Sequence, residues 1–533
     1  MSTTARQSAW CVLLLVVLMT ATLRYGLLDV PLERDEGEYA YGGQLILQCM
    51  PLYEHLYSMK LPGIYAAYSA LILLFGHSHK AIHLGLLLIN TATIVVIFLL
   101  AKRLINPLTG IIAAASFAVL SIGQSVQGVF ANAEHFVILP AVSAALLLLK
   151  ALDEDIPRLM FYSGLLFGLA FLMKQHGALF IAFGGFYLLT DLSFNRNAEN
   201  RRSKIRGFLL FCLGAIAPYG LTCLIFFLSG GFEKFWFLTF EYAKTYSSQI
   251  SLRMAWALFK TSGFSIGRSM FMIWIFVGIG LMALLLDERF RHRSIFIAMF
   301  TIFSFFAVCP GFYFRPHYFI MVLPAAALLF AIGISSIANI LSFVRLREVQ
   351  YGLSILVAVF CLAVSVYQQR NFLFQMTPFQ ASRSTYGFNP FPESLEISRF
   401  IKSHSKKDEH IAVIGSEPQI YFYSERLSAS GYIYMYPLME KQPFALQMQK
   451  EMIHEIESIK PKFLIFINII TSWLKRPDSN PLVFEWFNSY RAKHYKLVGL
   501  ADLLKDKTIY HWTPKIKDNP KSQLWIAVFE RTD

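Results

Sequence analysis

Long apolar segments recur along the first 370 residues of the chain, and they constrain its fold more than any other feature. A helix that crosses a bilayer needs about 20 mostly apolar residues, because hydrocarbon offers no water to its backbone polar groups. With 56% hydrophobic and 15% charged residues, the composition is that of a membrane protein. About eleven segments approach this length, near residues 9–29, 81–100, 108–129, 136–150, 159–173, 177–192, 207–229, 267–286, 294–309, 317–341 and 351–368. We therefore expect a polytopic α-helical membrane protein with about eleven transmembrane helices.

Basic residues mark alternate connections between these segments, as in the runs at 201–206 and 289–293. Cytoplasmic loops carry such an excess of Lys and Arg, so the net charge of +14 indicates membrane orientation and not nucleic-acid binding. No clear small-residue cleavage site follows the first segment, so we interpret it as an uncleaved helix with a cytoplasmic amino terminus. An odd number of crossings then places the chain after residue 369 on the extracytoplasmic side.

The outer loops are expected to lie along the membrane surface, whereas the tail is expected to form a separate domain. The first outer loop, residues 30–80, contains an apolar stretch at 64–75 that is too short to span, so we expect it to lie along the interface. The loop at 230–266 mixes aromatic and charged residues and predicts another surface-lying helix. We expect residues 1–369 to form a transmembrane domain and residues 370–533 a periplasmic α/β domain.

Within that tail, ESLEISRFIKSHSKKDE (393–409) is typical of a helix, and IAVIG (411–415) and KFLIFIN (462–468) of buried strands. WIAVFER (525–531) is expected to close the sheet. The aromatic run IYFYSERLSASGYIYMY (420–436) allows two interpretations. It covers an active site or contacts a glycan, or it forms ordinary core strands, and its pattern favours strands.

Carboxylates gather where the chain first leaves the membrane. The run ERDEGEYAYGG (33–43) contains Asp35 and Glu36, and the short outer loop between the third and fourth segments contains Glu134. Partly desolvated carboxylates at a membrane surface can take a proton from an alcohol or hold a cation. The alternative is a solvated charged collar at the level of the headgroups. Topology nevertheless brings the three carboxylates to one face of the membrane.

Cationic side chains lie on the same outer side, against the positive-inside trend: Lys60, Lys174, Arg315 and His317. Fixed positive charge beside the bilayer suits a lipid-linked phosphate, on which negative charge develops as it leaves. The alternative for each residue alone is a side chain that snorkels from a helix end. No GxxxxGK[ST], GxSxG or dinucleotide-binding motif is present, which argues against an ATP-driven pump, an α/β-hydrolase and a Rossmann enzyme.

These residues resemble the C-type membrane glycosyltransferases, which include protein O-mannosyltransferases and bacterial lipid A aminoarabinose and lipopolysaccharide-core sugar transferases. The resemblance covers roughly residues 1–370. It rests on the Asp35-Glu36 pair that opens the first outer loop, on Lys60 before Pro62, and on Glu134 at the second acidic position. The segment HYFIMVLPAAALL (317–329) also resembles a helix found late in many bacterial members.

The resemblance implies an enzyme that uses a polyprenyl-phosphate sugar as its donor. By this resemblance Asp35 is the general base, Lys60 holds the phosphate, and Glu36 and Glu134 orient Asp35 or bind donor hydroxyls. Lys174, Arg315 and His317 are further candidates for the phosphate or the sugar. The sugar leaves polyprenyl phosphate by direct displacement with inversion. Some members bind a divalent metal ion near this site and others do not, so the resemblance leaves a metal cofactor open.

The acceptor implied is an extracytoplasmic hydroxyl of a glycan, lipid or protein in contact with a bacterial inner membrane, with lipopolysaccharide or another envelope glycan favoured. Two other classes stay open. A lipid-linked substrate transporter or flippase would also need many helices and membrane charge. A non-catalytic envelope assembly component would use the carboxy-terminal domain instead. Convergence of Asp35, Lys60 and Glu134 on one outer cavity would favour the enzyme.

Overall fold

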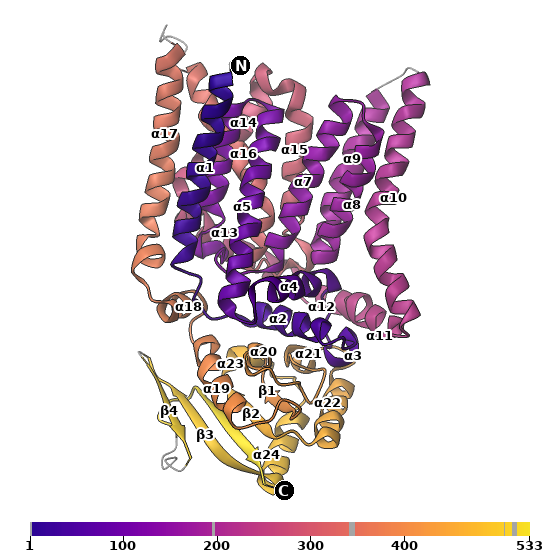
Figure 1. The fold of residues 1–533 in the computed structure, drawn as a ribbon, viewed down its shortest axis with the longest axis vertical. Helices are drawn as coiled ribbons and strands as arrows, with labels where there is room; N and C mark the ends of the chain where they lie inside the picture. The colour runs from indigo at the N-terminus through magenta and orange to yellow at the C-terminus, as the bar shows by residue number, and fades with distance from the viewer. Residues whose placement is uncertain (1–2, 195–197, 341–346, 506, 514–519, 533) are drawn as a thin grey trace.

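The computed structural model describes residues 3–194, 198–340, 347–505, 507–513 and 520–532. Among these residues, eleven helices pack side by side as a bundle (Figure 1). They are α1 Thr3–Tyr25, α5 His79–Leu104, α6 Pro107–Leu120, α7 Ala133–Asp153, α8 Pro157–Met173, α9 Ala178–Phe194, α10 Ala198–Leu228, α14 Phe271–Leu286, α15 Arg291–Phe306, α16 Leu323–Ile340 and α17 Arg347–Gln368. Each of the eleven expected segments overlaps one of them, although several bounds differ and residue 341, at the end of the tenth, lies outside the described residues.

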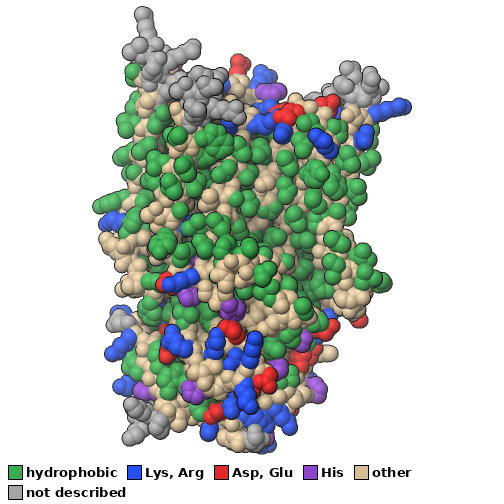
Figure 2. All heavy atoms as spheres, in the orientation of Figure 1, with side chains coloured by type: hydrophobic (Ala, Val, Ile, Leu, Met, Phe, Trp, Pro, Cys, Tyr) green, Lys and Arg blue, Asp and Glu red, His purple; other side chains and the backbone are tan. Residues whose placement is uncertain are grey.

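Within the described residues, five helices are long and apolar enough to cross a membrane, or six if a bent pair counts as one span. The five lie at 8–25, 79–104, 133–153, 201–228 and 316–337, and the pair is α13 (Leu252–Ser269) with α14, bent by 103°. The count of eleven crossings is not confirmed by this criterion, because α6, α8, α9, α15 and the apolar part of α17 are shorter than 18 residues. Figure 2 shows hydrophobic side chains over the bundle and charged side chains at both ends of the molecule, as in a multi-pass membrane protein.

Short helices lie across the lower end of the bundle in Figure 1. They are α2 Arg34–Leu47, α3 Leu52–His55, α4 Pro62–Phe75, α11 Phe232–Trp236, the π-helical η3 Phe237–Tyr242 and α12 Ala243–Ser247. The 3-10 helix η6, Pro316–Val322, leads into α16. The apolar stretch expected at the interface is therefore α4, whose first residue is Pro62, where proline has no hydrogen bond to lose.

The carboxy-terminal part contains a five-stranded sheet in the order β1-β2-β5-β3-β4. Strands β1 (Ile411–Ile414) and β2 (Phe463–Asn468) are parallel, and β5 (Trp525–Arg531), β3 (Tyr495–Leu503) and β4 (Thr508–Trp512) pair antiparallel. The helices of this part are α18 Pro378–Tyr386, α19 Phe391–Ser403, α20 Gln419–Ser424, α21 Tyr436–Met439, α22 Ala445–Ile459, α23 Ile470–Trp473 and α24 Leu482–His494. An α/β arrangement is confirmed.

Two expectations about the tail are wrong. The segment WIAVFER does not close the sheet but forms its central strand β5, because it pairs with β2 on one side and β3 on the other. The aromatic run 420–436 forms no core strand: it contains most of α20, then a loop that ends at α21, with one isolated bridge between Ser428 and Ile411. Its Ser-Ala-Ser-Gly centre favours a turn over a strand.

A single hydrophobic core joins the carboxy-terminal part to the outer helices. It contains strand residues such as Val413 and Ile465 together with Tyr41 of α2 and Tyr65 of α4. Gly37 permits this packing, since a Cβ atom there would lie 2.6 Å from the backbone nitrogen of Gln419 in α20. The sheet is thus fixed directly against the helix that carries Asp35.

Candidate active site

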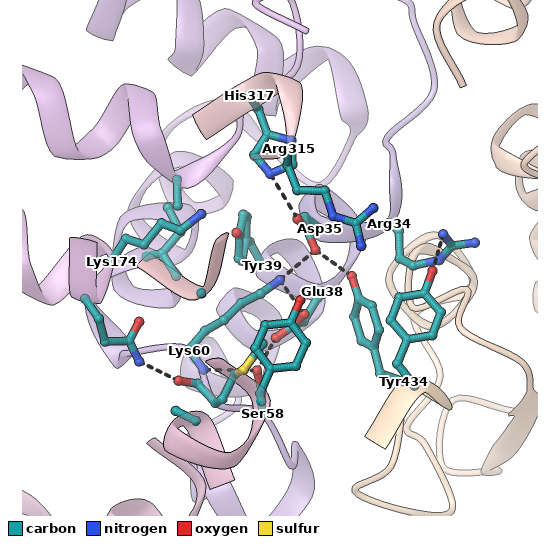
Figure 3. Close-up of a pocket in the computed structure, with 18 of the residues that line it drawn as sticks. Arg34, Asp35, Glu38, Tyr39, Ser58, Lys60, Lys174, Arg315, His317 and Tyr434 are labelled. Carbon is teal, nitrogen blue, oxygen red and sulfur yellow. Dashed lines mark hydrogen bonds and ion pairs between the residues drawn. The ribbon is translucent and has the colours of Figure 1, made fainter. Parts of the chain in front are cut away.

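A cavity of about 630 Å³ lies where the bundle, the outer helices and the carboxy-terminal part meet. Five of the residues expected at the site line it: Asp35, Lys60, Lys174, Arg315 and His317. They come from α2, from the loop before α4, from the turn after α8 and from the start of η6. Figure 3 shows that these side chains converge from separate elements.

Asp35 lies at the centre of this group, in the first turn of α2. Its Oδ1 accepts hydrogen bonds from Lys60 Nζ and from the Tyr434 hydroxyl, each at 2.7 Å. Its Oδ2 lies 4.0 Å from His317 Nε2. Oδ1 therefore accepts two hydrogen bonds, and Oδ2 is the oxygen that can receive a proton.

The start of α2 fixes the direction of Asp35. Glu33 and Glu36 form a capping box, in which each side chain accepts a hydrogen bond from the other residue's backbone N–H. Because α2 begins immediately after this cap, Asp35 faces the cavity and Glu38, three residues later, lies on the same side of the helix.

Lys60 joins Asp35 to Glu38. Its ammonium donates to Glu38 Oε2 at 2.7 Å, and Glu38 Oε1 also accepts from Ser58 Oγ at 2.5 Å and from the Tyr65 hydroxyl at 2.6 Å. Two of the three N–H groups of Lys60 are engaged, which leaves one for a ligand. The sequence run 33–43 contained Glu38, and its i,i+3 relation to Asp35 is the signal that could have identified it.

Lys174 and Glu134 form a second ion pair beside the first. Lys174 Nζ donates to Glu134 Oε1 and lies 4.0 Å from the centre of the Tyr318 ring. Glu134 is buried in the first turn of α7, and it touches the cavity through Lys174 without lining it. Of the three residues expected to converge on one cavity, Asp35 and Lys60 line it, whereas Glu134 does not and lies behind Lys174.

Glu36 points away from the cavity, which it does not line. Its side chain is fully buried, accepts from the backbone N–H of Ala131 and lies 2.9 Å from His83 Nε2. Successive residues of a helix differ by about 100° in direction, so Glu36 lies on a different side of α2 from Asp35. The structure thus places Glu36 in a role that fixes α2 against α5 and the loop before α7.

Arg315 and His317 form the opposite wall. His317 Nδ1 lies 2.8 Å from the side-chain oxygen of Gln127, which fixes the ring. Arg315 opens to the cavity, and among the described residues no carboxylate lies within ion-pairing distance of it. Lys60 and Lys174 are both paired with carboxylates, so the positive charge of Arg315 is the one that a ligand in the cavity can best use.

Electrostatics keep Asp35 ionised. Burial alone would raise the pKa of its carboxyl, but Lys60, His317 and Tyr434 together hold it well below its usual range. Burial also opposes the charge of Lys60, yet Asp35 and Glu38 raise its pKa above the ordinary value. In contrast, burial and the charges of Asp35 and Glu36 raise the pKa of Glu33 well above normal. Lys60 therefore favours the ionised form of Asp35, whereas burial favours the protonated form of Glu33.

The carboxy-terminal part contributes side chains from the aromatic run 420–436, for which cover of an active site was one of the two interpretations. Besides Tyr434, the cavity is lined by Tyr436, whose hydroxyl accepts from Arg34 Nη1 at 2.7 Å. Arg34 also forms a buried ion pair with Glu417 at 2.6 Å. These residues are almost 400 positions from α2, so no local spacing could reveal them.

The donor set does not fit a divalent metal ion as it stands. Asp35 and Glu38 already share the ammonium of Lys60, and the described residues contain no group of three or more His, Cys, Asp or Glu side chains that could hold a metal. Divalent cations need several oxygen ligands or a set of three or four nitrogen and sulfur ligands. No step is therefore assigned to a metal.

The family model of dolichyl-phosphate-mannose-protein mannosyltransferases matches residues 60–221. A search among curated proteins found no significant match.

Solved structures provide more extensive matches. ArnT from Cupriavidus metallidurans, bound to undecaprenyl phosphate, aligns with a TM-score of 0.58 at 14% identity, over 99% of this chain and 98% of its own. The oligosaccharyltransferase AglB from Archaeoglobus fulgidus, in complex with an inhibitory peptide and a dolichol-phosphate, aligns with a TM-score of 0.56 at 12% identity. That match covers 97% of this chain and 75% of AglB. At such identities the likeness establishes the shared fold.

Proposed function

We propose that the chain is a C-type membrane glycosyltransferase, which transfers a sugar from a polyprenyl-phosphate donor to an acceptor hydroxyl with inversion; the match to the mannosyltransferase family model and the shared fold with ArnT and AglB support this proposal. The observation that carries this proposal is Asp35, held ionised by Lys60 in a cavity that Arg315 also lines. A charged base and an unpaired cation in one cavity are what a displacement of phosphate by an alcohol requires.

In the proposed reaction, the acceptor oxygen attacks the anomeric carbon while its proton passes to Asp35 Oδ2. The bond between the anomeric carbon and the phosphate oxygen breaks, and polyprenyl phosphate leaves with that electron pair. Its phosphate gains negative charge in the step, which Arg315 and the third N–H of Lys60 stabilise. Attack opposite to the leaving group inverts the configuration at the anomeric carbon.

The other expected residues have supporting roles in this proposal. Lys174, neutralised by Glu134 and packed on Tyr318, shapes the wall beside the phosphate, and His317 lies nearest to the oxygen that receives the proton. Glu36 supports the cap of α2 from behind. Glu38 holds Lys60 in place.

The proposed active site faces the extracytoplasmic side of a bacterial inner membrane. Exposed Arg201, Arg202 and Arg206 lie at the start of α10, far from the cavity along that helix, where the positive-inside rule places the cytoplasm. By this orientation residues 370–533 form a periplasmic domain, and an envelope glycan or lipid such as lipopolysaccharide is the favoured acceptor.

The test uses purified protein in vesicles with a panel of undecaprenyl-phosphate sugars, and it measures sugar incorporated into envelope lipids together with undecaprenyl phosphate released. Asp35→Asn should slow transfer by about 10²–10⁴-fold, the usual contribution of a general base. The matched control is Asp29→Asn, since Asp29 is half-exposed and pairs with Lys80 away from the cavity. A wild-type rate in Asp35→Asn would show that Asp35 is not the general base. A wild-type protein that transfers no sugar from any donor would overturn the proposed function.

A further inference from the structure

Helix α13 is unlike its neighbours in the bundle because it turns away from them. It meets α14 at 103°, so it runs across the direction of the bundle and not along it. Its sequence, LRMAWALFKTSGFSIGRS, contains three cations and no carboxylate. A helix that lies across a bundle of membrane spans lies in the plane of the membrane.

One side of α13 is packed and the other is open. Ala255 and Ile266 are buried, whereas Trp256 and Phe264 are 59% and 71% exposed. Bulky aromatic side chains with apolar bodies are typical of the region between hydrocarbon and water. The open side of α13 therefore faces a lipid boundary.

The cations of α13 lie on this open side. Arg253, Lys260 and Arg268 follow the spacing i, i+7, i+15, which at 100° per residue keeps them within a stripe of about 80°. All three are exposed, and among the described residues none has a hydrogen-bond or ion-pair partner. Lys260 lies 5.6 Å from the Trp256 ring centre. The row formed by Arg253, Lys260 and Arg268 therefore presents positive charge at the depth of the headgroups, and no carboxylate of the described residues forms an ion pair with it.

We propose that α13 is an in-plane helix whose Arg253–Lys260–Arg268 row binds the headgroups of anionic phospholipids. This proposal does not depend on the sugar-transfer reaction. Its partner is the bulk anionic lipid of the leaflet, because the row is extended along one helix and its three cations do not line the cavity that contains Arg315.

The packed side of α13 connects this lipid contact to the cavity wall. The Ser262 hydroxyl donates to the backbone oxygen of Phe314 at 2.8 Å, and Phe259 packs against Phe314 and Phe319. Phe314 immediately precedes Arg315, and Phe319 follows His317 in η6. Headgroup binding thus stabilises the segment that carries two of the cavity residues.

Native mass spectrometry of the full chain, released from vesicles of phosphatidylcholine with phosphatidylglycerol, tests the proposal. Each basic residue near an anionic surface contributes about fivefold in affinity, so the Arg253→Gln/Lys260→Gln/Arg268→Gln variant should lose its preference for phosphatidylglycerol by about a hundredfold. The matched control replaces three exposed cations of the carboxy-terminal part, Lys407, Lys450 and Lys493, by Gln and should keep it. Tryptophan quenching by brominated phosphatidylglycerol should also exceed quenching by brominated phosphatidylcholine, and Trp256→Phe should abolish this difference.

Equal phosphatidylglycerol retention in wild type and the α13 variant would overturn the proposal. So would a variant that keeps phosphatidylglycerol but loses added undecaprenyl phosphate, because the row would then serve the donor and not bulk lipid. Both readouts are binding measurements, so they stand whether or not sugar transfer is observed.

Discussion

The Tyr434 hydroxyl donates a 2.7 Å hydrogen bond to Asp35 Oδ1 across 399 positions of sequence, from the carboxy-terminal part to the first turn of α2. Because Lys60 occupies the same oxygen, Tyr434 fixes the plane of the carboxylate and leaves Oδ2 open. The carboxy-terminal part is therefore a component of the site and not merely a cover over it.

Removal of this hydroxyl should change the pH dependence of transfer. A hydrogen bond to a charged group is worth about 1.5–3 kcal/mol, and 1.4 kcal/mol corresponds to one pKa unit. In Tyr434→Phe the pKa of Asp35 should rise, so the base becomes protonated at higher pH and the acidic limb of kcat/KM moves up by about one to two units. Tyr432→Phe is the control, since the Tyr432 hydroxyl donates to Glu451 outside the cavity. Coincident acidic limbs in Tyr434→Phe and wild type would contradict this role.

Replacement of Lys60 should have a larger effect of the same sign. The ammonium is the main group that lowers the pKa of Asp35, so Lys60→Met should lose transfer at neutral pH and recover part of it as the pH rises. Lys60→Arg keeps the charge and should retain more activity than Lys60→Met across the range. The control is Lys80→Met, because Lys80 is exposed and pairs with Asp29. A Lys60→Met profile that is lower at every pH by one constant factor would show that Lys60 does not control the pKa of Asp35.

The neighbouring Arg34–Glu417 pair holds the carboxy-terminal part in place, so its loss should lower the stability of the fold. Arg34 also donates to Tyr436, and Glu417 is fully buried. Arg34→Met leaves a buried carboxylate without its partner, which typically costs about 3–5 kcal/mol. The double variant Arg34→Met/Glu417→Gln removes that charge and should regain part of the loss.

Thermal unfolding in detergent measures both effects. Arg399→Met provides the control, because Arg399 and Glu396 form an exposed pair of the kind that contributes about 0–1 kcal/mol. An Arg34→Met protein with the unfolding midpoint of wild type would show that the pair does not secure this interface.

The sequence predicted the parts of the site that follow from hydrophobic pattern and loop position. Asp35, Lys60, Lys174, Arg315 and His317 were identified because membrane crossings place their segments at one end of the bundle, and the structure brings all five to one cavity. Tyr434 lies in the aromatic run for which cover of an active site was one interpretation, but its contact with Asp35 depends on the packing of α20 against Gly37 and could not be predicted. Local periodicity contains no information about such long-range packing.

Errors of detail have similar causes. Glu36 was grouped with Asp35 because the residues are adjacent, yet helical rotation turns it toward His83 and makes Glu38 the second carboxylate of the site. In the tail, apolar β-rich residues correctly marked β1 and β2, while the partners of β5 depend on strand order, which hydrophobic pattern does not specify.

Arg315 provides the most direct test of where the donor phosphate lies. Arg315 has no carboxylate partner among the residues described, and its Arg315→Gln variant should bind undecaprenyl phosphate about 10–100-fold more weakly, the value of one hydrogen bond between charged groups. Because this attraction is electrostatic, wild-type binding should weaken as salt is added, and the variant should respond less. Arg370→Gln, at the exposed end of α17, should match wild type. Binding of undecaprenyl phosphate that is equal in Arg315→Gln and wild type at low salt would place the phosphate elsewhere in the cavity, with Lys60 as its remaining cationic contact.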